Sequence, residues 1–160
     1  MTHGSVVALD ARDPASDLAG NDTALRVKTD PELPRGVLIS GRSGQGKSAL
    51  ALALMAFGAR LVADDRVLLE PRNGRLIATC PAALSGLVEA RGIGLLRARC
   101  VPSAALMLVV DLDHEETERL PHPRFRHIAG VSLPCLHKID KAYFPAAILQ
   151  YLKAGRVETQ

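Results

Sequence analysis

Residues 41–48 read GRSGQGKS, a glycine-rich stretch whose residue types could hold a phosphate group. Gly41, Gly46, Lys47 and Ser48 satisfy the G-x-x-x-x-G-K-[ST] spacing of a phosphate-binding loop. Glycines let backbone N–H groups approach phosphate oxygens, the lysine reaches the β- and γ-phosphates, and the serine hydroxyl ligates Mg²⁺. The candidate nucleotide-binding residues are therefore Gly41, Arg42, Ser43, Gly44, Gln45, Gly46, Lys47 and Ser48.

The segments on either side of this loop suit a phosphate site. GVLIS at 36–40 is an apolar run that predicts a buried strand, and the alanine- and leucine-rich run at 47–57 predicts a helix that ends before Gly58. A helix N-terminus adds unpaired N–H groups and partial positive charge. The alternative is a glycine-rich turn that happens to precede a helix.

Two adjacent carboxylates, Asp64 and Asp65, end the predicted strand ARLVADD at 59–65. Neighbouring strand residues point to opposite faces, so the two side chains should do different work unless the strand ends there. One could help to hold Mg²⁺, and the other could accept a proton from an attacking hydroxyl. Hydrolysis would need only a positioned water, and Asp-Asp-Arg also suits a plain turn.

The other apolar runs and turn signals predict a mixed α/β domain. Asn73-Gly74 indicates a hairpin between RVLLE and RLIATC. The segment 81–92, which opens with proline and closes with glycine, predicts a helix, and 141–155 predicts a second helix with Pro145 in its first turn. The charged, proline-broken segment 113–127 predicts a surface loop. Further strands are predicted at 5–9, 23–28, 92–98 and 103–113.

Composition narrows the classes of partner. A chain of 160 residues is most simply one domain, and its net charge of +3 suits a phosphorylated ligand or an acidic protein. That charge is too weak, and tryptophan is absent, so nucleic acid is not indicated. Widely spaced Cys80, Cys100 and Cys135 indicate free thiols. Without a signal-peptide pattern or an apolar run long enough for a bilayer, we expect a cytoplasmic protein with no membrane partner.

Taken in order, the GRSGQGKS loop, LVADD and LVEARGIG resemble the HPr kinase/phosphorylase family. That family shows a GxSGxGKS loop, an LVADD strand and an LLEIRGLGI-like signature, in which Glu89, Arg91 and Gly92 are in place here. His3-Gly4 resembles the His-Gly that precedes the first strand of the family's catalytic domain.

The resemblance runs in order over roughly residues 3–111 and more weakly over 130–153. It implies an α/β, P-loop-containing catalytic domain similar to the nucleotide-binding core of phosphoenolpyruvate carboxykinase, with a mixed sheet, hairpins and few helices. HRD and DFG signatures of eukaryotic protein kinases are absent from the sequence, in agreement with that core.

The same resemblance implies a function. The protein would use ATP and Mg²⁺ to phosphorylate a serine of the carrier protein HPr, or of its nitrogen-branch relative, and would thereby regulate the phosphotransferase system. Reverse phosphorolysis with inorganic phosphate is a known capacity of the family. The implied catalytic residues are Asp64 as general base, His3 at the phosphate site and Lys47, the implied metal-side residues are Ser48, Asp65 and Glu89, and the implied substrate or subunit contacts are Glu89, Arg91 and Gly92.

The sequence departs from the family pattern in three places. The N-terminal domain of the typical member is absent, so residues 1–160 read as a single catalytic domain, like short alphaproteobacterial forms. The late Lys-x-Gly-Arg-Asn loop is replaced by HKIDKAYF, where His137, Lys138 or Lys141 could stand in for the arginine. The C-terminal helix is short. The last two departures bear on phosphorolysis and on the homo-oligomer, a hexamer or trimer, that the resemblance implies.

Two other functions remain open at this point. One is a small-molecule kinase on the same core, which a deep pocket lined by arginines would favour. The other is a sensor that binds nucleotide or phosphate, has weak catalysis and signals by association. An Asp64→Asn variant separates the sensor from a kinase, because a sensor would keep its output while a kinase would lose turnover.

Overall fold

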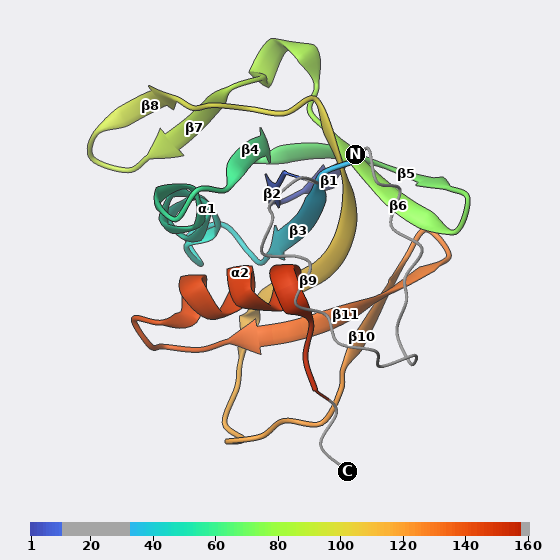
Figure 1. Cartoon of the computed structure of the whole chain (residues 1–160). Coiled ribbons are helices and arrows are strands. Elements are labelled where there is room, and N and C mark those ends of the chain that lie inside the picture. Colours follow the sequence, from blue (N-terminus) through green and yellow to red (C-terminus); the bar gives the residue numbers. More distant parts are fainter. Residues whose placement is uncertain (11–32, 158–160) are drawn as a thin grey trace.

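A computed structural model describes residues 1–10 and 33–157 of the chain. Its larger sheet contains β1 (Thr2–His3), β2 (Ser5–Leu9), β3 (Arg35–Ser40), β4 (Arg60–Ala63), β5 (Arg66–Arg72), β6 (Arg75–Thr79), β9 (Ser103–Glu115), β10 (Phe125–Ile128) and β11 (Val131–Lys138). A small second sheet contains β7 (Leu87–Ala90) and β8 (Gly94–Arg97). The helices are α1 (Lys47–Ala56), α2 (Phe144–Ala154) and a 3₁₀ turn at Ala82–Leu84 (Figure 1).

The strands of the larger sheet are hydrogen-bonded in the order β1-β5-β6-β9-β3-β2-β4, and β11 pairs with β9 and with β10. β3 is parallel to β9 and β9 is parallel to β11, whereas β3 is antiparallel to β2 and β5 is antiparallel to β6. The sheet is therefore mixed, as predicted. Because β3 and β9 are parallel neighbours, their carboxyl ends meet at one edge, where the glycine loop leaves β3.

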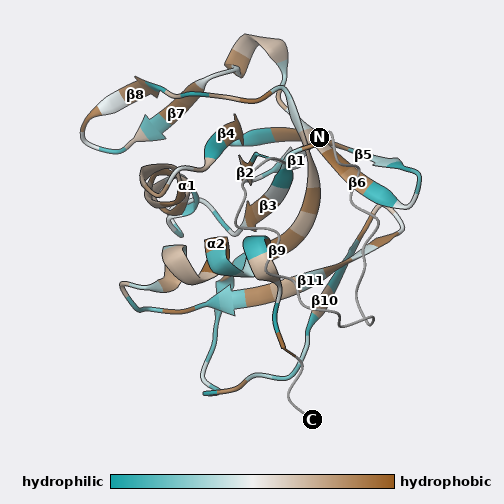
Figure 2. Ribbon diagram, in the orientation of Figure 1, coloured by the Kyte–Doolittle hydropathy of each residue, from teal (hydrophilic) through white to brown (hydrophobic). Residues whose placement is uncertain are grey.

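The sheet is buried on both faces at its centre. On one face Val37 and Ile39 of β3 pack with Leu54 of α1 and Ile148 of α2. On the other face Leu38 packs with side chains of the curling strands β6, β9 and β11. This two-sided burial explains why β3 is a continuous apolar run instead of an alternating one. Figure 2 shows the hydrophobic residues gathered along the central strands and on α1.

Most of the predicted elements are confirmed. The strands at 5–9, 36–40, 92–98 and 103–113 correspond to β2, β3, β8 and β9, and the two long helices lie where the sequence placed them. The Asn73-Gly74 turn joins β5 to β6, and both residues have positive φ, 51° and 75°. The predicted strand at 23–28 lies outside the described residues. None of the helices in residues 1–10 and 33–157 is long and apolar enough to cross a membrane.

Two predictions were wrong. The segment 81–92 is not a helix: after one 3₁₀ turn it continues as β7, which pairs with β8 in a hairpin. Gly86 and Gly92 have positive φ of 72° and 83°, so they break a helix and shape the turns at either end of β7. The segment 113–127 is not a loop throughout, because β9 continues to Glu115 and β10 begins at Phe125.

Gly36 lies in β3 at a position that packs closely against β9. A Cβ at this position would lie 3.1 Å from Ala104 Cβ and 3.1 Å from Leu106 Cδ2. We expect Gly36→Val to lower the free energy of unfolding by about 1–3 kcal/mol, because the larger side chain overpacks a close-packed core. Urea denaturation measures this change. Ser132→Val adds the same side chain at an exposed position of β11 and is the control; equal stability of the two variants would contradict the close approach.

Candidate active site

The glycine loop connects β3 to α1 in a conformation that its glycines make possible. Gly44 and Gly46 have φ of 86° and 95°, in the left-handed region that favours glycine. Gly41 lies so close to β9 that a Cβ there would be 3.1 Å from Leu112 Cβ. Gly46 occupies the N-cap position of α1, and no side chain caps this helix. The N–H groups of its first turn are thus left for a ligand, which is the usual arrangement at an anion site.

Lys47 folds back over the loop that it follows. Its Nζ donates to Gly41 O at 2.8 Å and to Arg42 O at 3.0 Å. The ammonium group therefore lies at the loop itself. When a phosphate enters, its charged oxygens would replace these neutral carbonyls as the hydrogen-bond acceptors of Lys47. Gln45 N donates to Arg42 O at 3.3 Å, which closes the turn in the middle of the loop.

Asp64 joins the loop helix to two other elements. Its carboxylate accepts from Ser48 Oγ at 2.9 and 3.0 Å, from Ser5 Oγ at 2.5 Å and from Glu89 N at 3.1 Å. The residue is only 7% exposed. A buried carboxylate is tolerated because its oxygens are hydrogen-bonded. Ser48 and Asp64, predicted from separate motifs, are thus in direct contact.

Asp65 points away from that cluster into solvent. Its side chain is 71% exposed, and Oδ1 lies 3.6 Å from His3 Nδ1 while Oδ2 lies 3.9 Å from Arg66 Nε. Its φ of 65° is uncommon for a residue other than glycine, although aspartate is among those that tolerate it. β1 pairs with β5, and Gly4 N donates to Asp65 O at 3.1 Å, so His3 is held beside the carboxylate.

The signature residues lie on and after β7. The backbone of Glu89 contacts Asp64, while its side chain is exposed. Arg91 and Gly92 lie in the exposed turn between β7 and β8. Figure 1 shows this hairpin extending beside α1, away from the larger sheet. The structure therefore brings the backbone of Glu89 to Asp64, and it leaves Arg91 and Gly92 at the end of the hairpin.

The donor set at Ser48 and Asp64 fits Mg²⁺ that is shared with a nucleotide. Mg²⁺ is usually held by one or two protein carboxylates together with waters and substrate phosphates, and rarely by a cage made of protein alone. A hydroxyl and a carboxylate in contact beneath the phosphate loop match that pattern. Residues 1–10 and 33–157 contain no group of three or more His, Cys, Asp or Glu that could hold a metal ion.

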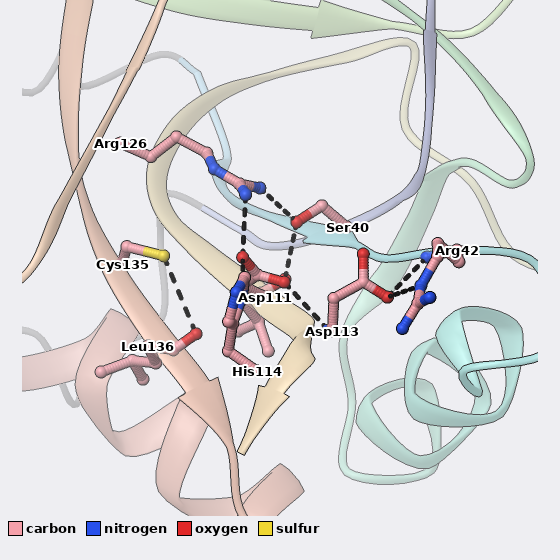
Figure 3. A network of polar contacts seen from close by, with 9 residues as sticks. Ser40, Arg42, Asp111, Asp113, His114, Arg126, Cys135 and Leu136 are labelled. Atoms are coloured by element: carbon pink, nitrogen blue, oxygen red, sulfur yellow. Dashed lines mark hydrogen bonds and ion pairs between the residues drawn. The ribbon is translucent and has the colours of Figure 1, made fainter. Parts of the chain in front are cut away.

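A polar network on the other side of the loop was missed by the sequence reasoning. Asp111, only 4% exposed, accepts from Arg126 Nη2 at 2.8 Å, and Arg126 Nη1 donates to Ser40 Oγ at 2.6 Å. Asp113 Oδ1 accepts from Arg42 N at 2.9 Å and from Arg42 Nε at 3.2 Å (Figure 3). The only signal in the sequence is the Asp-x-Asp spacing at a strand end, which does not reveal that β9 lies beside β3.

Two histidines lie near this network, and one of them, His137, is a candidate to replace the arginine of the family's late basic loop. His137, at the end of β11, stacks on His114 with ring centroids 5.3 Å apart. Burial, and then the nearby Arg124 guanidinium, lower the pKa of His137 below its ordinary value. A histidine that is neutral at pH 7 is a poor replacement for a fixed positive charge, which leaves Lys138 and Lys141 as the cationic candidates.

The contrast between the two aspartates can be tested through stability. We expect Asp64→Asn to lower the free energy of unfolding by about 1–3 kcal/mol, because an amide N–H₂ then faces donors in a buried cluster. Asp65→Asn, at an exposed position, should change it by less than about 0.5 kcal/mol. Chemical denaturation of both variants measures the difference. Equal effects would mean that the two carboxylates share one environment.

Comparison with known proteins places this arrangement in a family. Residues 33–136 match the sequence model described as the HPr Serine kinase C-terminal domain. The chain is 42% identical over 110 residues to an HPr kinase/phosphorylase of Leptothrix cholodnii, and the alignment covers 60% of this chain and 34% of that protein. It is 44% identical over 110 residues to the one from an Acidovorax species, with 60% and 35% coverage. The chain thus spans about a third of the length of these curated relatives.

A solved structure agrees at the level of the fold. The structure of the Hpr(Ser) kinase/phosphatase from Coxiella burnetii superimposes with a TM-score of 0.67 and 23% sequence identity, covering 93% of this chain and 91% of that one. The mixed α/β architecture predicted from the sequence is therefore shared with that protein. Because the family's sequence model matches well over half of the residues, the chain belongs to the HPr serine kinase C-terminal domain family.

Proposed function

We propose that this protein transfers the γ-phosphoryl group of ATP to a serine hydroxyl of an HPr-type phosphocarrier protein. The observation that carries the proposal is the contact between Ser48 Oγ and the Asp64 carboxylate beneath the glycine loop. The next residue, Asp65, is exposed and lies beside His3. The names of the similar proteins support HPr as the acceptor. Regulation of the phosphotransferase system would follow from phosphorylation of that carrier.

Nucleotide binding would use the loop and the start of α1. The backbone N–H groups of the loop and the uncapped helix N-terminus would surround the β- and γ-phosphates, and Lys47 would turn from its carbonyl partners to the phosphate oxygens. Ser48, Asp64 and the nearby Glu89 would hold Mg²⁺, directly or through water. When bound, Mg²⁺ would neutralise phosphate charge and align the γ-phosphoryl group.

The division of labour between the two aspartates follows from their surroundings. The family resemblance implies Asp64 as the base and Asp65 at the metal, but the contacts favour the reverse. A base must reach a hydroxyl presented by another folded protein, and Asp65 is exposed next to His3. Asp64 is buried and already accepts from Ser48, Ser5 and Glu89 N. We therefore assign proton acceptance to Asp65 and the metal side to Asp64.

The transfer balances in a single displacement. The serine oxygen attacks the γ-phosphorus, the bond from that phosphorus to the β,γ-bridging oxygen breaks, and ADP leaves with its electron pair. The serine proton passes to the Asp65 carboxylate. In phosphorolysis inorganic phosphate attacks the phosphorus of the phosphoserine, the bond from that phosphorus to the serine oxygen breaks, and pyrophosphate forms. Protonated Asp65 gives its proton to the serine oxygen.

The surface around the site suits a protein acceptor better than a small molecule. His3 and Asp65 are both exposed. The β7–β8 hairpin that contains Glu89 presents Ile93 and Leu95, which are 79% and 70% exposed. Such an open surface can meet a folded partner, whereas a small-molecule kinase encloses its substrate. We place the reaction in the cytoplasm, the compartment that supplies ATP. The homo-oligomer that the resemblance implies stays a prediction.

The proposal is tested with Mg²⁺, labelled ATP and HPr-type carriers from the source organism, by following label into serine. We expect the wild-type protein to label the carrier, and Lys47→Ala to abolish labelling because the phosphates lose their cation. Asp65→Asn should lower kcat about 10²–10⁴-fold, the usual contribution of a general base. Its affinity for ATP should stay nearly unchanged. Glu70→Gln, an exposed carboxylate on β5, is the matched control.

The result for Asp64→Asn separates the two assignments. We expect it chiefly to weaken Mg²⁺-dependent nucleotide binding, since Asp64 contacts Ser48. Full loss of turnover in Asp64→Asn with normal nucleotide affinity, beside an active Asp65→Asn, would return the role of base to Asp64. Binding of ATP without labelling of any carrier would overturn the kinase function in favour of a nucleotide sensor.

A further inference from the structure

The carboxylate of Asp113 extends the pairing of two strands into the glycine loop. The parallel register between β3 and β9 ends at Ser40 opposite Asp111. Two residues beyond Ser40 and two residues beyond Asp111, Arg42 N donates to Asp113 Oδ1 at 2.9 Å. A side-chain oxygen thus continues the hydrogen bonding where the backbone of the loop turns away from β9. The guanidinium Nε of Arg42 donates to the same oxygen at 3.2 Å.

The first turn of the loop is held from two sides. Asp113 holds the N–H of Arg42, while Lys47 Nζ holds the carbonyls of Gly41 and Arg42. When a phosphate enters, Lys47 must leave those carbonyls to reach its oxygens. The hydrogen bond between Arg42 N and Asp113 does not involve Lys47. It can therefore keep the turn in place while the lysine moves to the phosphate.

Asp113 is itself fixed by a chain of contacts that reaches β10. Its N–H donates to Asp111 Oδ1 at 2.9 Å, and Asp111 Oδ2 accepts from Arg126 Nη2 at 2.8 Å. Arg126 also donates to Ser40 Oγ at 2.6 Å, so the end of β3 is tied to the same network (Figure 3). The hydrogen bond from the backbone of Arg42 is the main cause that lowers the pKa of Asp113, so this carboxyl stays ionised at neutral pH.

We propose that Asp113 is a positioning residue for nucleotide binding, which holds the Arg42 peptide so that the glycine loop is preformed for a phosphate group. The inference rests on the proposed function, because it takes the ligand of the loop to be a nucleotide phosphate. Its physical basis is preorganisation: a loop already held in its binding geometry loses less conformational entropy when the ligand enters.

Nucleotide affinity is the first readout. In Asp113→Ala the Kd for Mg²⁺–ATP, measured by calorimetry, should rise about tenfold or more, in line with the loss of a hydrogen bond to a charged acceptor. Asp113→Asn keeps an amide oxygen that can accept from Arg42 N, so its Kd should remain within about threefold of wild type. Glu70→Ala removes an exposed carboxylate that likewise pairs with an arginine, and it is the control.

Hydrogen exchange of the backbone amide of Arg42 is the second readout, and it needs no ligand. This amide should exchange faster in Asp113→Ala than in wild type, while amides at the centre of β3 and β9 keep their protection. Retained protection in those strands shows that the variant is folded. Asp113→Asn is the comparison variant, because it preserves the shape of the side chain and an oxygen that can accept from Arg42 N.

The outcomes are distinguishable. A wild-type protein that binds no nucleotide would overturn the proposed function, while the exchange of the Arg42 amide would still decide whether Asp113 holds the loop. A wild-type protein that binds ATP, with Asp113→Ala equal to it in Kd and in exchange, would overturn the positioning role. Asp113→Asn as weak as Asp113→Ala would also overturn it, since charge and not the acceptor would then matter.

Discussion

The buried carboxylate of Asp64 is the constraint on which the candidate site depends. An ionised carboxylate that is withdrawn from water must have its oxygens hydrogen-bonded, or the folded state is strongly destabilised. Its donors come from three separate elements: Ser5 on β2, Ser48 on α1 and the backbone of Glu89 on β7. Satisfying this one group therefore requires that the strand, the loop helix and the hairpin dock together, which assembles the site as the chain folds.

The parallel pairing of β3 with β9 has a comparable role on the other side of the loop. It brings Asp111 and Asp113 to the edge where the glycine loop begins. Asp111 is a second nearly buried carboxylate, and Arg126 from β10 neutralises it. The loop thus lies between two carboxylates that the fold had to satisfy, so the polar groups that stabilise the sheet edge also hold the phosphate-binding segment.

The adjacent aspartates illustrate how far a motif can be interpreted. LVADD identified both residues, but the work of each depends on what surrounds it. Asp64 turns inward to Ser48, whereas Asp65, with φ of 65°, turns outward to His3. No local pattern distinguishes these environments, because the partners are contributed by β1, β2, α1 and β7. The helix prediction for segment 81–92 was wrong for a related reason. Its proline and glycine suit a helix, yet pairing with β8 makes its second half the strand β7.

The sequence by itself determined the glycine loop, the strand and helix on either side of it, the Asn73-Gly74 hairpin and the family resemblance. These features depend on residues close together in the chain, where turn chemistry and backbone sterics decide the conformation. Only the tertiary structure decided that β9 lies beside β3, that Asp113 meets Arg42, and that one aspartate is buried while its neighbour is exposed. Those outcomes depend on pairing between distant segments, which is selected by burial and hydrogen bonding in the whole fold.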